Sequence, residues 1–130
     1  MRARMLALTL AALITGCWGN GAKQHSNFGA AATADLQAIK HGDCNYVTQH
    51  FDPLMAALSA TSLCANFRSY SEAYGGLKSE DAASSTRRGQ LTVVRIPLHL
   101  RDAAGEYRET YHPDGTVAGP YFLKPGVPLP

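Results

Sequence analysis

The segment LTVVRIPLHLR, residues 91–101, decides the fold class. Apolar side chains alternate in it with polar residues or proline, and this period of two predicts a β-strand with one buried face. The apolar positions are Val94, Ile96, Leu98 and Leu100. Proline cannot donate a ladder hydrogen bond, so Pro97 and Pro120 are each expected at a sheet edge or a bulge.

Two turns continue this pattern toward the C-terminus. Residues 102–105 are expected to form a hairpin connection, followed by a strand at 106–112. Pro113-Asp114-Gly115 predicts the next turn, and the last strand is expected at 116–123. The polar segment 77–88 predicts an irregular edge strand. The C-terminal half should therefore form an antiparallel meander.

Helical spacing of apolar residues precedes these strands. Helices are predicted over 33–41, 45–51, 54–58 and 59–74, where Gly42 and Gly75-Gly76 end the first and last. Helices followed by a meander define an α+β class, with the helices covering one face of the sheet. We expect a curved antiparallel sheet of three to four strands.

Residues 1–16 have the organisation of a bacterial export signal. The basic start MRAR precedes an uncharged run that is too short to span a bilayer. The following Ile14-Thr15-Gly16-Cys17 resembles a lipobox, in which the cysteine receives a diacylglycerol and cleavage occurs before it. We therefore predict a lipidated Cys17. The alternative is an ordinary secretory signal cut further on, for example after Gly21.

A lipidated Cys17 places the mature protein in the cell envelope, anchored to a membrane outside the cytoplasm. Because Trp18 rather than Asp follows the cysteine, a diderm bacterium would carry the protein on its outer membrane, facing the periplasm. Residues 17–32 are predicted to be a flexible tether, 33–125 the folded domain and 126–130 a proline-rich tail.

Charge argues against a nucleic-acid partner. Without Arg2 and Arg4 of the signal, ten of the 12 Lys and Arg remain, which equals the ten Asp and Glu. A neutral domain of this kind is not built to neutralise phosphates.

Two cysteines remain once Cys17 carries lipid. An even pair in an exported protein suggests a disulfide between Cys44 and Cys64, and the alternative is two buried free thiols. Neither cysteine has other ligands at metal-binding spacing, so no metal or cofactor is expected.

The residues from Leu36 to Pro125 resemble the DUF3887 domain, a small bacterial family of unknown function. The matching stretches are Gly42-Asp43 with Tyr46 and Phe51-Asp52, then Phe67-Arg68, 91–98 and 111–122. The resemblance implies an NTF2-like (cystatin-type) cone, in which helices fold against a curved sheet. It brings no catalytic residues, and this chain departs from the family pattern in its cysteine pair and in residues 79–88.

Glu109 is the sharpest site candidate. A three-residue turn at 113–115 would place it on the apolar face of the meander, where a carboxylate can act as a general base or bind a polar group. The expected cross-strand pairs are Tyr111 with Val117, Glu109 with Gly119 and Tyr107 with Tyr121. The alternatives are a rim residue paired with Arg95 or Arg108, or a face turned to solvent by a one-residue register change.

Aromatic side chains are expected to line the core and a pocket around Glu109. These candidates are Tyr70, Tyr74, Tyr107, Tyr111 and Tyr121. The histidines lie on different predicted elements and are expected at the surface or at helix ends, with His99 near Arg108 across the hairpin. They are His41, His50, His99 and His112. The chain has no Gly-x-Ser-x-Gly elbow and no phosphate-binding glycine loop.

Three functional hypotheses follow from these observations. The first is a non-enzymatic binding module for an apolar small molecule or an envelope protein, including an immunity protein against a periplasmic toxin. The second is a SnoaL-like isomerase or hydratase that acts on a small apolar substrate with Glu109 as base. The third is an accessory subunit that forms a homodimer through its sheet.

Overall fold

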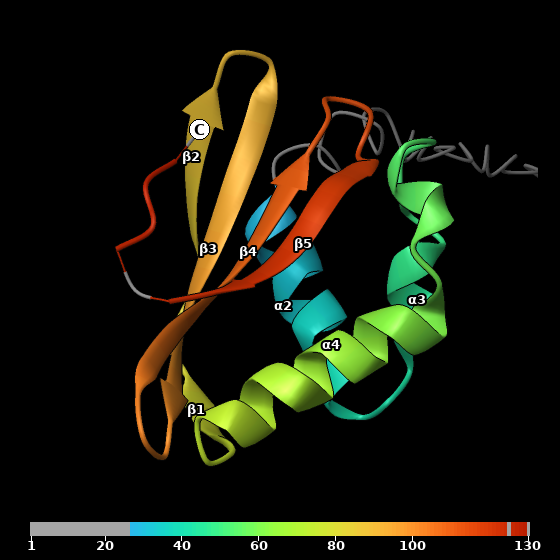
Figure 1. The fold of residues 1–130 in the computed structure, drawn as a ribbon. Coiled ribbons are helices and arrows are strands. Elements are labelled where there is room, and N and C mark those ends of the chain that lie inside the picture. Colours follow the sequence, from blue (N-terminus) through green and yellow to red (C-terminus); the bar gives the residue numbers. More distant parts are fainter. Residues whose placement is uncertain (1–26, 125, 130) are drawn as a thin grey trace, which may run out of the picture.

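The computed structural model describes residues 27–124 and 126–129, and they form an α+β fold in which helices precede all strands (Figure 1). The helical elements are α2 (Phe28–Lys40), α3 (Cys44–Thr48), the 3₁₀ turn η1 (Met55–Ala57) and α4 (Ala60–Ala73). The strands are β1 (Leu77–Glu80), β2 (Ser84–Arg88), β3 (Leu91–Leu100), β4 (Ala104–Tyr111) and β5 (Val117–Leu123). This open antiparallel sheet with packed helices is the predicted class and is consistent with an NTF2-like cone, although it has five strands rather than three to four.

Strand β3 is the centre of the sheet. It pairs with β4 on one side and with both β1 and β2 on the other, and β5 completes the sheet beyond β4. The break between β1 and β2 lies opposite Pro97, since Glu80 pairs with Leu98 and Ser84 with Arg95. Proline has no amide hydrogen to offer a partner there. Pro97 thus occupies a central strand, at the point where the neighbouring edge strand is interrupted.

Helix α2 begins five residues before the predicted start at Thr33. Asn27 caps it by accepting a hydrogen bond from the Ala30 amide at 3.2 Å. The Phe28 ring stacks on Tyr111 of β4 with centroids 4.6 Å apart, which fixes the first turn against the sheet. Residues 28–32, assigned to the tether from their Gly- and Ala-rich composition, therefore belong to the folded domain. The signal, Cys17 and the rest of the tether lie outside the described residues.

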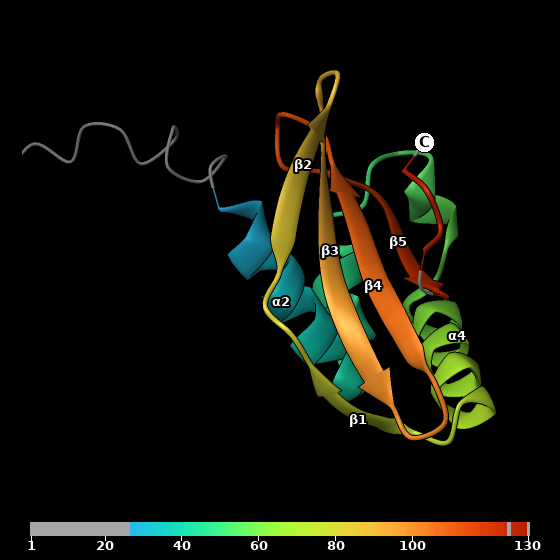
Figure 2. The same ribbon diagram turned by 90° about the vertical axis from the view of Figure 1, so that its left-hand side faces the viewer.

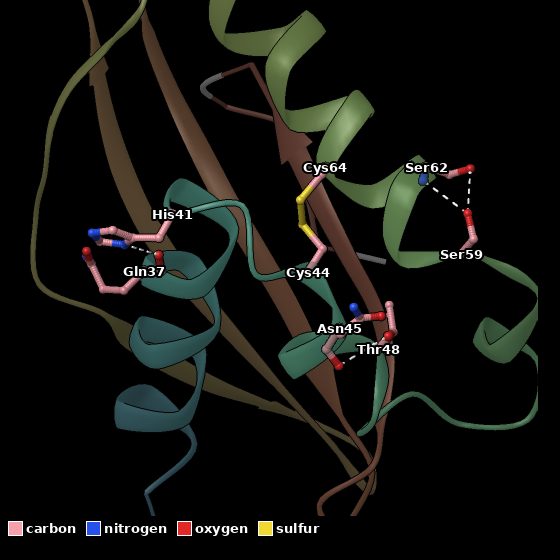
Figure 3. The surroundings of a disulfide bond; sticks show 8 residues. All are labelled: Gln37, His41, Cys44, Asn45, Thr48, Ser59, Ser62 and Cys64. Carbon is pink, nitrogen blue, oxygen red and sulfur yellow. Dashed lines mark hydrogen bonds between the residues drawn. A yellow bond between two sulfur atoms is a disulfide. The ribbon is translucent and has the colours of Figure 1, made fainter.

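The Cys44–Cys64 disulfide predicted from the sequence is present. It joins the first residue of α3 to α4, with Cα atoms 5.9 Å apart (Figure 3). Cys44 is fully buried, and Cys64 packs against the same core. The bond therefore holds the short helix α3, whose five residues are too few to be stable alone, against the longest helix.

The C-terminal segment lies across the outer face of the sheet, and Figure 2 shows it on the opposite side from α2. The Arg108 guanidinium of β4 donates to the carbonyls of Val127 and Pro128 at 2.6 and 3.1 Å. Beside it on this face, Val93 and Glu106 are buried although they point away from the helices. Arg108 is thus the link between the sheet and the proline-rich tail.

Candidate functional site

Glu109 of β4 is completely buried on the helix-facing side of the sheet, with 0% of its surface exposed. The Tyr111 hydroxyl donates to its Oε2 at 2.8 Å. Among the described residues, neither Glu109 Oε1 nor the buried Tyr107 hydroxyl has a hydrogen-bond partner. Buried polar atoms are nearly always paired, so these two oxygens mark an unusual place in the core.

Asp35 of α2 brings a second carboxyl to this place. It is 4% exposed and lies in the buried stripe of its helix, between Ala32 and Ile39. Its carboxyl is within hydrogen-bonding reach of Glu109, so that one proton held between them would satisfy both. Asp35 is not among the site residues predicted from the sequence. The signal that could have revealed it is an acidic residue at helical spacing within the series Phe28, Ala32 and Ile39.

Folding raises the pKa of both carboxyl groups. Burial raises the pKa of Asp35, while hydrogen bonding to Glu109 and the charge of His50 oppose that change. Burial, followed by the charge of Asp35, raises the pKa of Glu109 well above its ordinary value. Burial also raises the pKa of Tyr111 and of Tyr107, which remain neutral donors. No lysine or arginine among the described residues contributes to either carboxyl pKa.

A pocket of about 150 Å³ opens onto Asp35. It is lined by Phe28, Ala31, Asp35, Tyr46, His50, Tyr111 and Gly115. Glu109 does not line it, because Asp35 and Tyr111 stand between Glu109 and the opening. A ligand in this pocket would touch Asp35 directly and would sense Glu109 only through Asp35 and the Tyr111 hydroxyl.

The two alternative placements of Glu109 are wrong. Arg95 and Arg108 both pair with Glu106, at 2.8 and 2.7 Å, on the outer face of the sheet. Glu109 points the other way and faces no solvent. Its apolar-face position, predicted from strand alternation, is confirmed.

The expected register of β4 and β5 is correct only next to the turn. Tyr111 pairs with Val117, but a bulge then shifts the ladder, so that Glu109 pairs with Pro120 and Tyr107 with Phe122. Tyr121 is consequently on the outer face and 51% exposed, and it lines a hollow with Tyr70 and Phe122 rather than the predicted pocket around Glu109. Its ring folds over Gly119, where any Cβ would collide with it.

The remaining tyrosines divide between the two ends of the core. Tyr107 and Tyr111 lie with Glu109, as expected. Tyr70 lies in α4, and Tyr74 caps the C-terminus of that helix. Their rings contact each other at the opposite end of β4, where the Tyr70 hydroxyl donates to the Leu123 carbonyl at 2.9 Å. The predicted set of pocket tyrosines is thus not one group.

The histidines also separate. His50 lines the Asp35 pocket, and His99 pairs with Asp81 at 2.9 Å rather than lying by Arg108, since Arg108 is opposite Arg95. His112 contacts Asp52 at 2.8 Å. The other Asp52 oxygen accepts from the Met55 amide, so this pair fastens the turn before η1 to the end of β4. We interpret it as a structural contact.

Within residues 27–124 and 126–129, no three His, Cys, Asp or Glu side chains gather closely enough to hold a metal ion. No family model, curated protein or solved structure matches the chain.

Proposed function

We propose that this protein is an envelope-anchored lipoprotein whose domain binds a small molecule in the Asp35 pocket. The observation that carries the proposal is the pocket itself: aromatic residues line it around the Asp35 carboxyl, which is 4% exposed, and the Glu109 carboxyl is fully buried behind it. Binding sites in proteins are typically apolar hollows with a few convergent polar groups whose pKa values are shifted. A purely structural core would be more stable without two adjacent buried acids.

The lipobox at Cys17 and the Cys44–Cys64 disulfide support placement in the envelope, because disulfides persist in oxidising compartments. No helix within the described part of the chain is long and apolar enough to cross a membrane. A Cys17→Ala variant should lose labelling by radioactive palmitate and leave the membrane fraction, while Cys44→Ala should keep both. Unchanged labelling of Cys17→Ala would contradict the anchor.

Ligand binding can be tested with a variant that fills the pocket. Ala31 is an exposed helical residue on the pocket wall, so Ala31→Leu should occupy the pocket without altering the core. Ala34→Leu is the matched control, on the exposed surface of the same helix and outside the pocket.

The measurement is the backbone amide NMR spectrum of the full chain in non-ionic detergent, with a panel of neutral, anionic and cationic fragments. We expect at least one fragment to shift the amides of Ala31 and Gly115. Ala31→Leu should abolish that shift, and Ala34→Leu should preserve it. A panel without any such fragment would contradict the proposed function.

An enzymatic alternative has one specific observation in its favour. A carboxyl that shares a proton with a buried neighbour can accept a proton near neutral pH, as a general base requires. In that case Asp35 would touch the substrate, and Glu109 would act through it as a positioning residue. The isomerisation of 3-cyclohexenone, followed by ultraviolet absorbance, tests this directly. Turnover unchanged by Asp35→Asn would exclude the alternative.

A further inference from the structure

The carboxyl pair of Asp35 and Glu109 is left without a cation. In the described residues, the positive group that influences Asp35 is the exposed His50, while no lysine or arginine takes part. Apart from a proton shared with Asp35, Glu109 Oε1 has no hydrogen-bond partner among the described residues, and neither has the buried Tyr107 hydroxyl. Buried charges normally have a partner of opposite sign, because an unpaired one is strongly disfavoured.

The walls in front of this pair favour positive charge as well. The aromatic residues Phe28, Tyr46 and Tyr111 line the pocket, and an aromatic ring attracts cations to a face that is not already stacked, as one face each of Phe28 and Tyr111 is. The volume of 150 Å³ corresponds to roughly five water molecules at ~30 Å³ each. That space suits a small organic head group rather than an extended ligand.

We propose, on the basis of the proposed binding function, that the ligand is a small alkylammonium ion carrying at least one N–H. Its N–H donates to the Asp35 carboxylate, and its alkyl groups contact Phe28 and Tyr46. Glu109 strengthens the site from behind when the bound ammonium displaces the shared proton, because the carboxyl pair then carries negative charge that no described lysine or arginine neutralises. An anion would be repelled by the pair, and a metal ion would find only two carboxyl groups where three or more ligands are usual.

Proton release should accompany binding. The groups that face Asp35 are Glu109, Tyr107 and Tyr111 from β4 and His50 from the segment after α3. A bound ammonium favours the fully ionised carboxyl pair, so the shared proton leaves to solvent. Affinity should therefore increase as pH rises from 5 to 8.

The test uses four probes of nearly the same shape: tert-butylammonium, tert-butyl alcohol, pivalate and tetramethylammonium. Each is titrated into the full chain in non-ionic detergent while the pocket amides are followed by NMR. tert-Butylammonium should bind about tenfold or more tightly than the neutral alcohol. Tetramethylammonium, which lacks an N–H, should be weaker than tert-butylammonium, and pivalate should not bind.

Variants separate charge recognition from folding. Asp35→Asn keeps the shape of the side chain and should abolish the preference for tert-butylammonium over tert-butyl alcohol. Asp43→Asn removes the same charge from an exposed position outside the pocket and should leave the preference intact. The amide spectrum of each variant without ligand reports whether it is folded. If Asp35→Asn does not fold, the loss of preference at pH 5 relative to pH 8 in the unmodified chain tests the same claim.

The outcomes distinguish this inference from the proposed function. Equal binding of the ammonium and the alcohol would overturn the cation inference while pocket binding stands. The cation inference would also be overturned, and pocket binding would stand, if none of the four probes bound but another fragment bound and lost its binding in Ala31→Leu. If no fragment of any class binds, both proposals fall.

The ammonium can be free in solution or carried on a lipid headgroup. Ethanolamine and phosphatidylethanolamine vesicles, with phosphatidylglycerol vesicles as the matched control, separate these sources by displacement of tert-butylammonium. Displacement by ethanolamine alone supports a free amine, and displacement by both ethanolamine and its lipid supports a headgroup. Displacement by neither, or equally by phosphatidylglycerol, would contradict the proposal.

Discussion

Asp35 and Glu109 lie side by side in the core, although one belongs to the first described helix and the other to the fourth strand. The charge of Asp35 disfavours ionisation of Glu109 in addition to the effect of burial, whereas hydrogen bonding to Glu109 partly offsets the effect of burial on Asp35. The folded state therefore binds protons at these two carboxyl groups more tightly than the unfolded chain does. Such a pair reduces stability at neutral pH, which is typical of residues retained for a function.

Replacing Glu109 by glutamine should stabilise the protein at high pH. Folding raises the pKa values of both acids, so above pH ~4 the native state binds more protons than the unfolded state, and the free energy of unfolding falls as pH rises. The amide of Glu109→Gln can still accept from Tyr111 and can donate to Asp35. The gain should be about 1.4 kcal/mol for each pKa unit by which folding raises the Glu109 pKa.

Urea unfolding at pH 4 and pH 8 measures this difference. Glu109→Gln should flatten the decline in stability between the two pH values, with little change at pH 4. Glu72→Gln, at an exposed position of α4, serves as the control and should leave the decline as it is. If Glu109→Gln were destabilised equally at both pH values, the carboxyl group would be required for packing of the core and would not be a source of instability at high pH.

Removing the disulfide should weaken the helical layer. The bond closes a separation of 20 residues between Cys44 and Cys64, for which the chain-entropy model gives about 3 kcal/mol. The double variant Cys44→Ala, Cys64→Ala should lose roughly that amount in urea unfolding. Dithiothreitol should destabilise the unmodified chain to a similar extent and leave the double variant unaffected. If dithiothreitol also destabilised the double variant, its effect on the unmodified chain could not be attributed to the Cys44–Cys64 bond.

The fold could be predicted from sequence to the extent that periodicity was unambiguous. The alternation over residues 91–101 located β3, and the turn residues after it located β4 and β5 within one or two positions. The start of α2 was missed because Gly29 and the alanines after it resemble a linker. What stabilises that turn is a distant contact, Phe28 on Tyr111, which local spacing does not reveal.

The candidate site was predictable only on its strand. Glu109 is conspicuous as a charged residue on an apolar strand face, whereas Asp35 resembles a surface residue until the helix is placed against the sheet. The predicted position of Tyr121 failed for a different reason. A bulge near Ala118 adds one residue to β5, and one residue is enough to move a side chain to the other face.

Loss of the Arg108 side chain should destabilise the protein and release the tail. Arg108 donates to Glu106 at 2.8 Å and to two tail carbonyls, and Arg108→Ala would leave the buried Glu106 with Arg95 alone. We expect a loss of about 2 kcal/mol in urea unfolding and faster removal of the last residues by carboxypeptidase. The exposed Arg88→Ala should change stability by less than about 0.5 kcal/mol. Equal effects of the two variants would contradict the role of Arg108 as the link between sheet and tail.

The close approach of Gly105 to Tyr70 should make position 105 intolerant of any side chain. A Cβ there would collide with the Tyr70 hydroxyl and with Leu100, so Gly105→Ala should destabilise the protein by about 2 kcal/mol. Tyr70→Phe alone should lose about 1 kcal/mol with its hydrogen bond to the Leu123 carbonyl.

In the double variant Gly105→Ala, Tyr70→Phe, the methyl group introduced at position 105 occupies the space that the hydroxyl vacates. Its destabilisation should therefore be smaller than the sum of the two single effects by about 1 kcal/mol. Gly29→Ala is the matched control. The Cβ added at position 29 would lie 3.7 Å from Ala83, which is an ordinary contact distance. Because position 29 is helical, Gly29→Ala should stabilise the protein by up to about 1 kcal/mol. Additive effects at positions 70 and 105 would mean that the backbone moves to relieve the collision. The contact between α4 and the β3–β4 hairpin would then be loose rather than closely packed.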